Sequence, residues 1–97
     1  MESSIVQATR FELVDDRNRV RAVLACGEAG APALTFIDED GTTRITIGIA
    51  WNAMPSIQVN AADGTARVAL VARPEGTGMV VVTDDLANSR VITSADR

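Results

Sequence analysis

The carboxylates of this chain gather in short clusters of a kind that can bind a metal ion. Three such clusters occur, at positions 15–16, 38–40 and 84–85. Ca²⁺ is commonly bound by the oxygen atoms of such turns. The common calcium motif, a twelve-residue loop between two helices, is absent, however. The segment around Asp63 has only that one carboxylate. We therefore interpret the clusters as turn residues and keep a calcium site as the alternative.

Arginine is the second recurring charge, and it returns every 23 residues, at Arg21, Arg44, Arg67 and Arg90. In one interpretation each aliphatic stem covers an apolar neighbour while the guanidinium pairs with a turn aspartate. In the other the four side chains form a ladder that binds an anion or a partner. We favour the first, because the recurring aspartates supply the counter-charge. Both interpretations place the arginines on the outer face, one per hairpin.

Catalytic chemistry is not indicated by the remaining residues. The chain has no histidine and no tyrosine, and it lacks a Gly-x-Ser-x-Gly sequence and a phosphate-binding loop. Cys26 is the only cysteine, and no histidine is present to activate its thiol. We interpret it as a small core residue, because its equivalents in the repeat are Ile49 and Ala72. The sequence therefore predicts a protein that is not an enzyme, with no catalytic residue, metal or cofactor.

The elements that must position these side chains form a repeat of 23 residues. The copies occupy 11–33, 34–56, 57–79 and, incompletely, 80–97. Residues 1–10 precede them as a predicted capping segment, in which we expect Ile5 and Val6 to form a short strand. Numbering each copy from 1 to 23, position 1 is always apolar, at Phe11, Leu34, Ile57 and Val80. A fixed period without insertions is typical of a repeat architecture, so residues 1–97 are predicted to form one repeat domain.

Each copy is predicted to be a β-hairpin, because its apolar residues alternate with period two. Asp40-Gly41 and Asp63-Gly64 separate the alternating runs, as in two-residue hairpin turns in which both residues have positive φ. Asn18 suits the equivalent position in the first copy, whereas Ala87 does not, so we expect a different last turn.

The same turn sets the strand register. It places Phe36 opposite Ile45, Leu34 opposite Ile47, Val59 opposite Val68 and Ile57 opposite Leu70, and it places Arg44 across from Ile37. Glycine and proline are dense at positions 16–23 of each copy and break strand ladders. We therefore expect these positions to be irregular connections.

Charge and hydropathy exclude several classes of partner. The 97 residues have a formal net charge of −4, which disfavours nucleic acid and an anionic membrane surface. No apolar run approaches the ~18 residues of a membrane-spanning helix, and residues 1–10 lack the pattern of a signal peptide. We expect a cytoplasmic or virion- and assembly-associated location.

Assembly is expected because one such hairpin is too small to fold alone. A lone two-stranded hairpin is marginal in water, and aromatic residues make up only 3% of the chain. The fold class that follows is all-β, with tandem hairpins whose apolar faces meet in a closed homo-oligomer, a β-prism or spiral-like trimer in the simplest case. The alternative is a single-chain β-solenoid.

Trp51 is the only tryptophan, and it lies in a predicted connection with Asn52 and Met54. Tryptophan and methionine in a loop can form a binding hot spot, and they can equally close one end of the core. We favour closure of the core. A contact with a carbohydrate or another protein through these residues is the alternative.

The repeated pattern of alternating strands, an Asp-Gly turn and a glycine- or proline-bearing connection resembles the shafts of trimeric viral and phage fibres, the triple β-spiral class. The phrase FELVDDRNRVRAVL at 11–24 is also similar to uncharacterised bacterial tandem-repeat proteins. The first resemblance implies an intertwined homotrimer with a role in spacing, attachment or decoration. The function we expect is thus a non-enzymatic structural or interaction module, with the binding module around Trp51 as the alternative.

Overall fold

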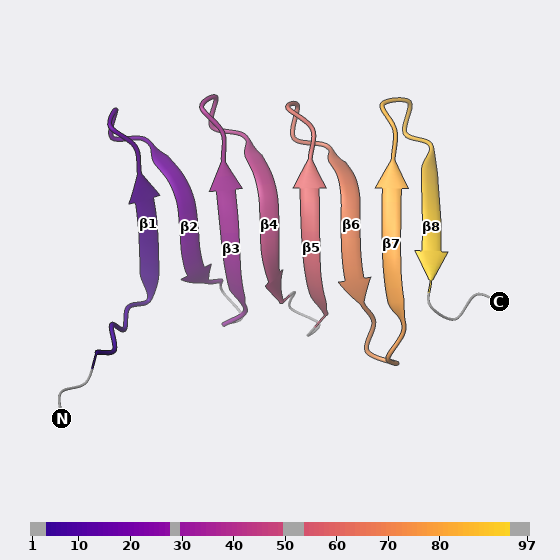
Figure 1. Ribbon diagram of the computed structural model, residues 1–97, viewed down its shortest axis with the longest axis horizontal. Helices are drawn as coiled ribbons and strands as arrows, with labels where there is room; N and C mark the ends of the chain where they lie inside the picture. Colours follow the sequence, from indigo (N-terminus) through magenta and orange to yellow (C-terminus); the bar gives the residue numbers. More distant parts are fainter. Residues whose placement is uncertain (1–3, 28–29, 50–53, 94–97) are drawn as a thin grey trace.

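The computed structural model describes residues 4–27, 30–49 and 54–93, and these residues form eight β-strands (Figure 1). The strands are β1 (Arg10–Val14), β2 (Val20–Cys26), β3 (Pro32–Ile37), β4 (Thr43–Ile49), β5 (Pro55–Asn60), β6 (Ala66–Ala72), β7 (Gly78–Thr83) and β8 (Ser89–Thr93). No helix occurs within the described residues. The predicted all-β class is confirmed.

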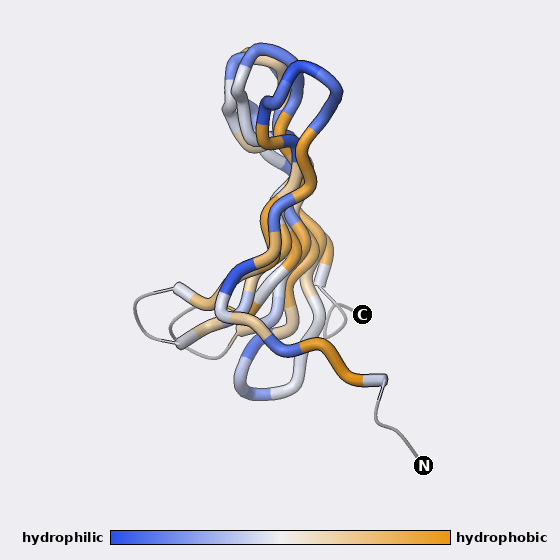
Figure 2. The backbone as a smooth tube through the Cα atoms, turned by 90° about the vertical axis from the view of Figure 1, so that its left-hand side faces the viewer, coloured by the Kyte–Doolittle hydropathy of each residue, from blue (hydrophilic) through white to orange (hydrophobic). Residues whose placement is uncertain are grey.

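All eight strands belong to one sheet, in which each strand pairs antiparallel with the next along the chain. Seen from its edge, the sheet is a single layer, with hydrophilic turns at one end and apolar strands below them (Figure 2). The sheet is open, because β1 and β8 lie at opposite edges. This antiparallel meander differs from the solenoid that the sequence left as an alternative, and the chain by itself forms no closed prism.

The strand register within the middle hairpins agrees with the prediction. Phe36 pairs with Ile45 and Leu34 with Ile47, and the third hairpin has the equivalent pairs, Val59 with Val68 and Ile57 with Leu70. Apolar pairs directly opposite each other stabilise a sheet. Because one face of each strand in these two hairpins carries the apolar pairs, a slip of one residue would turn all of these side chains to the other face.

The turns differ in type from the prediction. In the second hairpin, Gly41 N–H donates to Asp38 O (3.1 Å) and Asp38 N–H donates to Thr42 O (2.9 Å). Positive φ occurs at Gly41 but not at Asp40. This is a three-residue loop, a type I turn followed by one left-handed residue. The expected two-residue turn is wrong because only one residue here has the left-handed conformation.

The last turn follows the same pattern, against expectation. Ala87 has φ 64°, and its N–H donates to Asp84 O at 3.1 Å. Alanine resists this conformation, since its Cβ crowds the backbone there. The hydrogen bonds of the turn hold Ala87 in the left-handed conformation. Asn18, at the same position of the first turn, has φ 63°.

Hydrogen bonds close the first and the third connection between hairpins. Gly76 N–H donates to Arg73 O at 2.9 Å, and Gly30 N–H donates to Gly27 O at 2.9 Å. Both glycines have positive φ. Pro32 and Pro55 begin strands, a position that proline tolerates. The expectation that positions 16–23 of each repeat are irregular throughout was therefore wrong, because strands extend into both ends of this segment. All eight strands consequently join in one sheet.

The N-terminal segment does not form the predicted strand. Ile5 and Val6 lie outside every strand and are 74% and 77% exposed. The sheet as a whole also has almost no core. Ala22 is the only buried hydrophobic residue among those described, and no large side chain in that part of the chain is fully buried. A single layer has two surfaces and nothing between them, so its apolar residues stay accessible.

Candidate assembly surface

The repeated arginine occupies a β-bulge in each of the first three hairpins. In the first hairpin Val14 pairs with Val20 while Leu13 pairs with Ala22, so Arg21 is the extra residue. The pairings of the second and third hairpins skip Arg44 and Arg67 in the same way. A bulge leaves one residue unpaired and bends the strand. The sequence prediction that Arg44 faces Ile37 is wrong for this reason, because Thr43 takes that place.

Two of these arginines join one hairpin to the next. Arg21 Nε donates to Ile37 O (2.8 Å), and Arg44 Nε donates to Asn60 O (2.9 Å). Both acceptors are the last residues of the strands that open the following hairpins. Neither acceptor residue is paired with the strand that precedes its own. The bulged arginines thus hold neighbouring repeats together.

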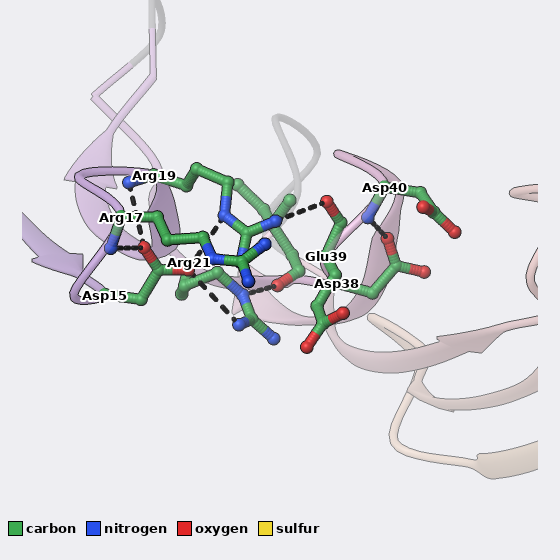
Figure 3. A network of polar contacts seen from close by, with 8 residues as sticks. Asp15, Arg17, Arg19, Arg21, Asp38, Glu39 and Asp40 are labelled. Atoms are coloured by element: carbon green, nitrogen blue, oxygen red, sulfur yellow. Dashed lines mark hydrogen bonds and ion pairs between the residues drawn. The ribbon is translucent and has the colours of Figure 1, made fainter.

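The arginine heads also meet the turn aspartates. Arg21 lies 3.6 Å from Asp15 and Arg44 lies 3.5 Å from Asp38, between side-chain nitrogen and oxygen atoms. Figure 3 shows the first of these pairs within a larger network, in which Arg19 donates to Asp15 and reaches the backbone oxygen of Glu39. Pairing of the arginine column with turn aspartates, predicted for all four copies, is thus present in the first two.

The position of the arginines differs from the prediction in one respect. Arg21 and Arg44 line a hollow of about 560 Å³ together with Leu13 and Phe36. They therefore border the apolar face and do not lie opposite it. A binding ladder of arginines stays a prediction.

The turn aspartates are occupied by backbone donors. Asp38 Oδ1 accepts N–H groups of Thr42 (3.0 Å) and Asp40 (2.9 Å). These hydrogen bonds, that of Thr42 first, lower the pKa of Asp38 below its usual value because they favour the charged form. Asp15 and Asp84 have lowered pKa values for the same reason. Within the described ranges no cluster of three metal-binding side chains occurs, and the calcium alternative stays untested.

The third turn replaces this aspartate by Ala61, and Asp63 takes over part of its role. Asp63 Oδ1 accepts the hydroxyl of Thr65 at 2.6 Å and its N–H at 2.9 Å. The Thr65 hydroxyl and then its N–H lower the pKa of Asp63. The turn is kept with a different set of donors.

Asn60 is a polar residue that sequence reasoning missed. It is buried, with 7% exposure, and its Nδ2 donates to Thr43 O at 2.9 Å while its Oδ1 accepts from Gln58. Position 4 is Val14 in the first repeat and Ile37 in the second. The replacement of an apolar residue by asparagine at this position was the sequence signal that could have pointed to Asn60.

Large apolar side chains form a row across all eight strands. Directly paired residues run without a break through Phe11, Leu24, Leu34, Ile47, Ile57, Leu70, Val80 and Ile92. A second row on the same side runs through Leu13, Ala22, Phe36, Ile45, Val59, Val68 and Val82, and it ends at Arg90. We call the surface of these two rows the apolar face.

The apolar face is open to solvent in the single chain. In the first row Leu24 is 46% exposed, Leu70 42% and Ile57 37%. Directly paired residues on the opposite face are smaller or polar, as in the run Thr35, Thr46, Gln58 and Ala69. Contiguous apolar surface of this extent on a soluble protein marks an interaction site. This face is the candidate functional site.

The apolar face is hollowed over its C-terminal half. The hollow measures about 780 Å³, and among its lining residues are Ile47, Ile49, Ile57, Leu70, Val80 and Ile92. It offers almost no polar group that could orient a small reactant. The arrangement can bury another apolar surface, and it brings no set of reactive groups together.

The remaining predicted residues contribute less. Trp51 and Asn52 lie outside the described residues, and Met54 is half-buried just before β5; binding at this connection stays a prediction. Cys26 is exposed at the end of β2, so its assignment to a core is wrong for the single chain. The described residues contain no helix with the length and hydrophobicity to cross a membrane.

No protein-family model and no curated protein sequence matches this chain.

Proposed function

We propose that this protein is a non-enzymatic structural module that works as a closed assembly of its own copies. The observation that supports this most is the apolar face, which runs through all four repeats and stays open in the single chain. Burying apolar surface is the main driving force for folding and for association. A one-layer sheet with so little buried inside it gains that burial only against another surface.

The chemistry of the chain supports a structural role over a catalytic one. Several of its charged side chains pair with one another or with backbone groups at the turns, and the larger hollow is apolar. The resemblance to fibre shafts fits a role in spacing, attachment or decoration within a larger structure. Three copies, as in those shafts, is the number we propose.

The experiment that tests the proposal is the mass of the whole chain in solution, measured by light scattering after size-exclusion chromatography. We expect one species at an integral multiple of the chain mass, three in the simplest case. A folded, stable monomer at micromolar concentration would contradict the proposal.

A further inference from the structure

We infer that copies of this chain meet through the apolar face, with the N-terminal half of one copy's face packed on the hollow of another copy. This rests on the proposed function and deepens it, because it names the contact surface and its orientation. The occupant of the face is a second copy of this chain.

The size of the sheet supports this contact. Eight strands of five to seven residues, with ~4.8 Å between neighbours, give a face of roughly 34 Å by 20 Å. A stable interface buries about 800 Å² on each partner, which is comparable to the whole of such a face. Two faces therefore supply this area when they overlap almost completely.

The repeat makes a second copy the best-matched occupant. The first apolar row places one large side chain on each strand, and neighbouring strands lie ~4.8 Å apart. Sheets that pack face to face interdigitate their inner side chains, with strands within about 30° of alignment. A second copy presents ridges and grooves with the same spacing, so the rows stay in step across the whole face. A surface that is not a β-sheet has no such period.

Shape supports the pairing of unlike halves. Both phenylalanines on the face belong to the N-terminal half, Phe11 on β1 and Phe36 on β3. Both are also exposed, at 43% and 38%. The larger hollow lies over β4 to β8, where the lining residues are aliphatic or small. The large rings of one copy thus suit the hollow of the next. Either a two-fold pair or a closed ring of three satisfies this contact.

The edges of the sheet, in contrast, are poor sites for growth. On β1, Arg10 and Glu12 form an ion pair with nitrogen and oxygen 2.6 Å apart. On β8, the register places Arg90 beside Val82, on the apolar face. Charges on edge strands are a device that blocks strand pairing between molecules. Assembly through the face leaves these charges at its rim.

Neighbouring residues of β5 provide a matched test. Ile57 and Gln58 are adjacent and both exposed, and they lie on opposite faces of the sheet. Ile57→Asp adds a charge to the apolar face, and Gln58→Asp adds the same charge to the other face. We expect Ile57→Asp to weaken assembly at least 100-fold in dissociation constant and Gln58→Asp to change it less than threefold, in light scattering over a dilution series.

A cross-linking experiment keeps the test decisive if Ile57→Asp fails to fold. Cys26 lies at the end of β2, beside the N-terminal half of the apolar face and on the same side of the sheet. A second chain carries Cys26→Ser and Val80→Cys, which moves the thiol to β7 in the other half. After co-refolding and treatment with a short bismaleimide, we expect dimers that join unlike chains to exceed those that join like chains severalfold.

The outcomes separate the two proposals. If the parent chain is a monomer, the proposed function and this inference both fail. If the parent assembles but Gln58→Asp weakens it as much as Ile57→Asp, the face is not the contact, while self-assembly stands. Cross-links between like chains in excess would overturn the pairing of unlike halves.

Discussion

The last hairpin differs from the first three although its residues follow the same repeat. In the first three the bulged arginine shifts the register by one, and repeat positions 12 and 14 reach the apolar face. In the last hairpin no shift occurs, and Arg90 and Ile92, at positions 11 and 13, take those places opposite Val82 and Val80. The presence or absence of one extra residue thus decides which side chains a strand presents.

This difference explains an irregularity of the sequence. Position 14 is Leu24, Ile47 and Leu70 in the first three copies but Thr93 in the last. Without the bulge Thr93 pairs with Met79 on the other face, so the apolar face does not need an apolar residue at this position. Inner strands that bear an arginine bulge continue the apolar face, and the edge strand that lacks the bulge ends it with a charge.

The largest effect is expected from placing the edge residue in an inner hairpin. Val68 is the third-hairpin counterpart of Arg90 on the second apolar row, paired with Val59 and Val82. Val68→Arg puts an unpaired charge on the apolar face, which the proposed assembly buries, and we expect a loss of about 3 kcal/mol in the free energy of unfolding. Urea denaturation measures it.

The reverse change, Arg90→Val, serves as the matched control. It should cost less than about 0.5 kcal/mol, as surface substitutions usually do, and should favour larger species in light scattering, because an edge charge is lost. Equal losses of stability in the two variants would show that the inner and last hairpins do not differ as described.

The left-handed residue of the turns gives the next effect. Gly41 has φ 85° and open space where a Cβ would lie, so Gly41→Ala isolates the conformational cost. We expect a loss of about 1 kcal/mol, and a gain of somewhat less for Ala87→Gly, since glycine costs more entropy on folding. Thermal unfolding should show opposite shifts in midpoint, and shifts of the same sign would contradict the shared turn type.

The arginine column should respond differently at its bulged and unbulged members. Arg44→Met keeps the aliphatic stem but removes the hydrogen bond to Asn60 O and the ion pair with Asp38. We expect a loss of about 1 kcal/mol, typical of one hydrogen bond. Arg90→Met should leave the free energy of unfolding nearly unchanged. A neutral Arg44→Met would mean that the bulged arginine does not hold the repeats together.

The smallest effect is expected from the pH dependence of the turns. The pKa of Asp38 is lowered from 3.8 in the folded state, so its contribution to stability is complete above that value and is lost as pH falls through the folded pKa. Asp38→Asn keeps an acceptor oxygen for both N–H groups but cannot titrate. Unfolding between pH 2 and 7 should show a shallower acid loss for Asp38→Asn, and identical profiles would contradict this role.

Much of the hairpin architecture was predictable from residue types. Alternation and Asp-Gly give the pairs Leu34 with Ile47 and Ile57 with Leu70, because an apolar face tolerates no slip. The bulges were not predictable by this reasoning, because the register derived from the Asp-Gly sequence assumed a two-residue turn. A signal for tight connections was present in Pro74-Glu75-Gly76, where proline suits the second position of a type I turn and glycine the left-handed residue after it.

The candidate site was predictable only in part. The arginine column and its aspartate partners follow from a fixed period, as Arg21 and Arg44 show. The continuous apolar rows depend on pairing between hairpins, and alternation within one strand carries no information about its neighbour in the next repeat. The exposure of Cys26 was missed because burial was argued from residue type, and a single layer leaves such residues open.

The central claim is that the apolar face of this one-layer sheet is covered by other copies of the chain. The most direct measurement is the mass of the intact protein by light scattering, at concentrations from millimolar to nanomolar, with circular dichroism on the same samples. We predict one closed species that loses its β-signal when it dissociates. A monomer that keeps its β-signal at every concentration would contradict the claim.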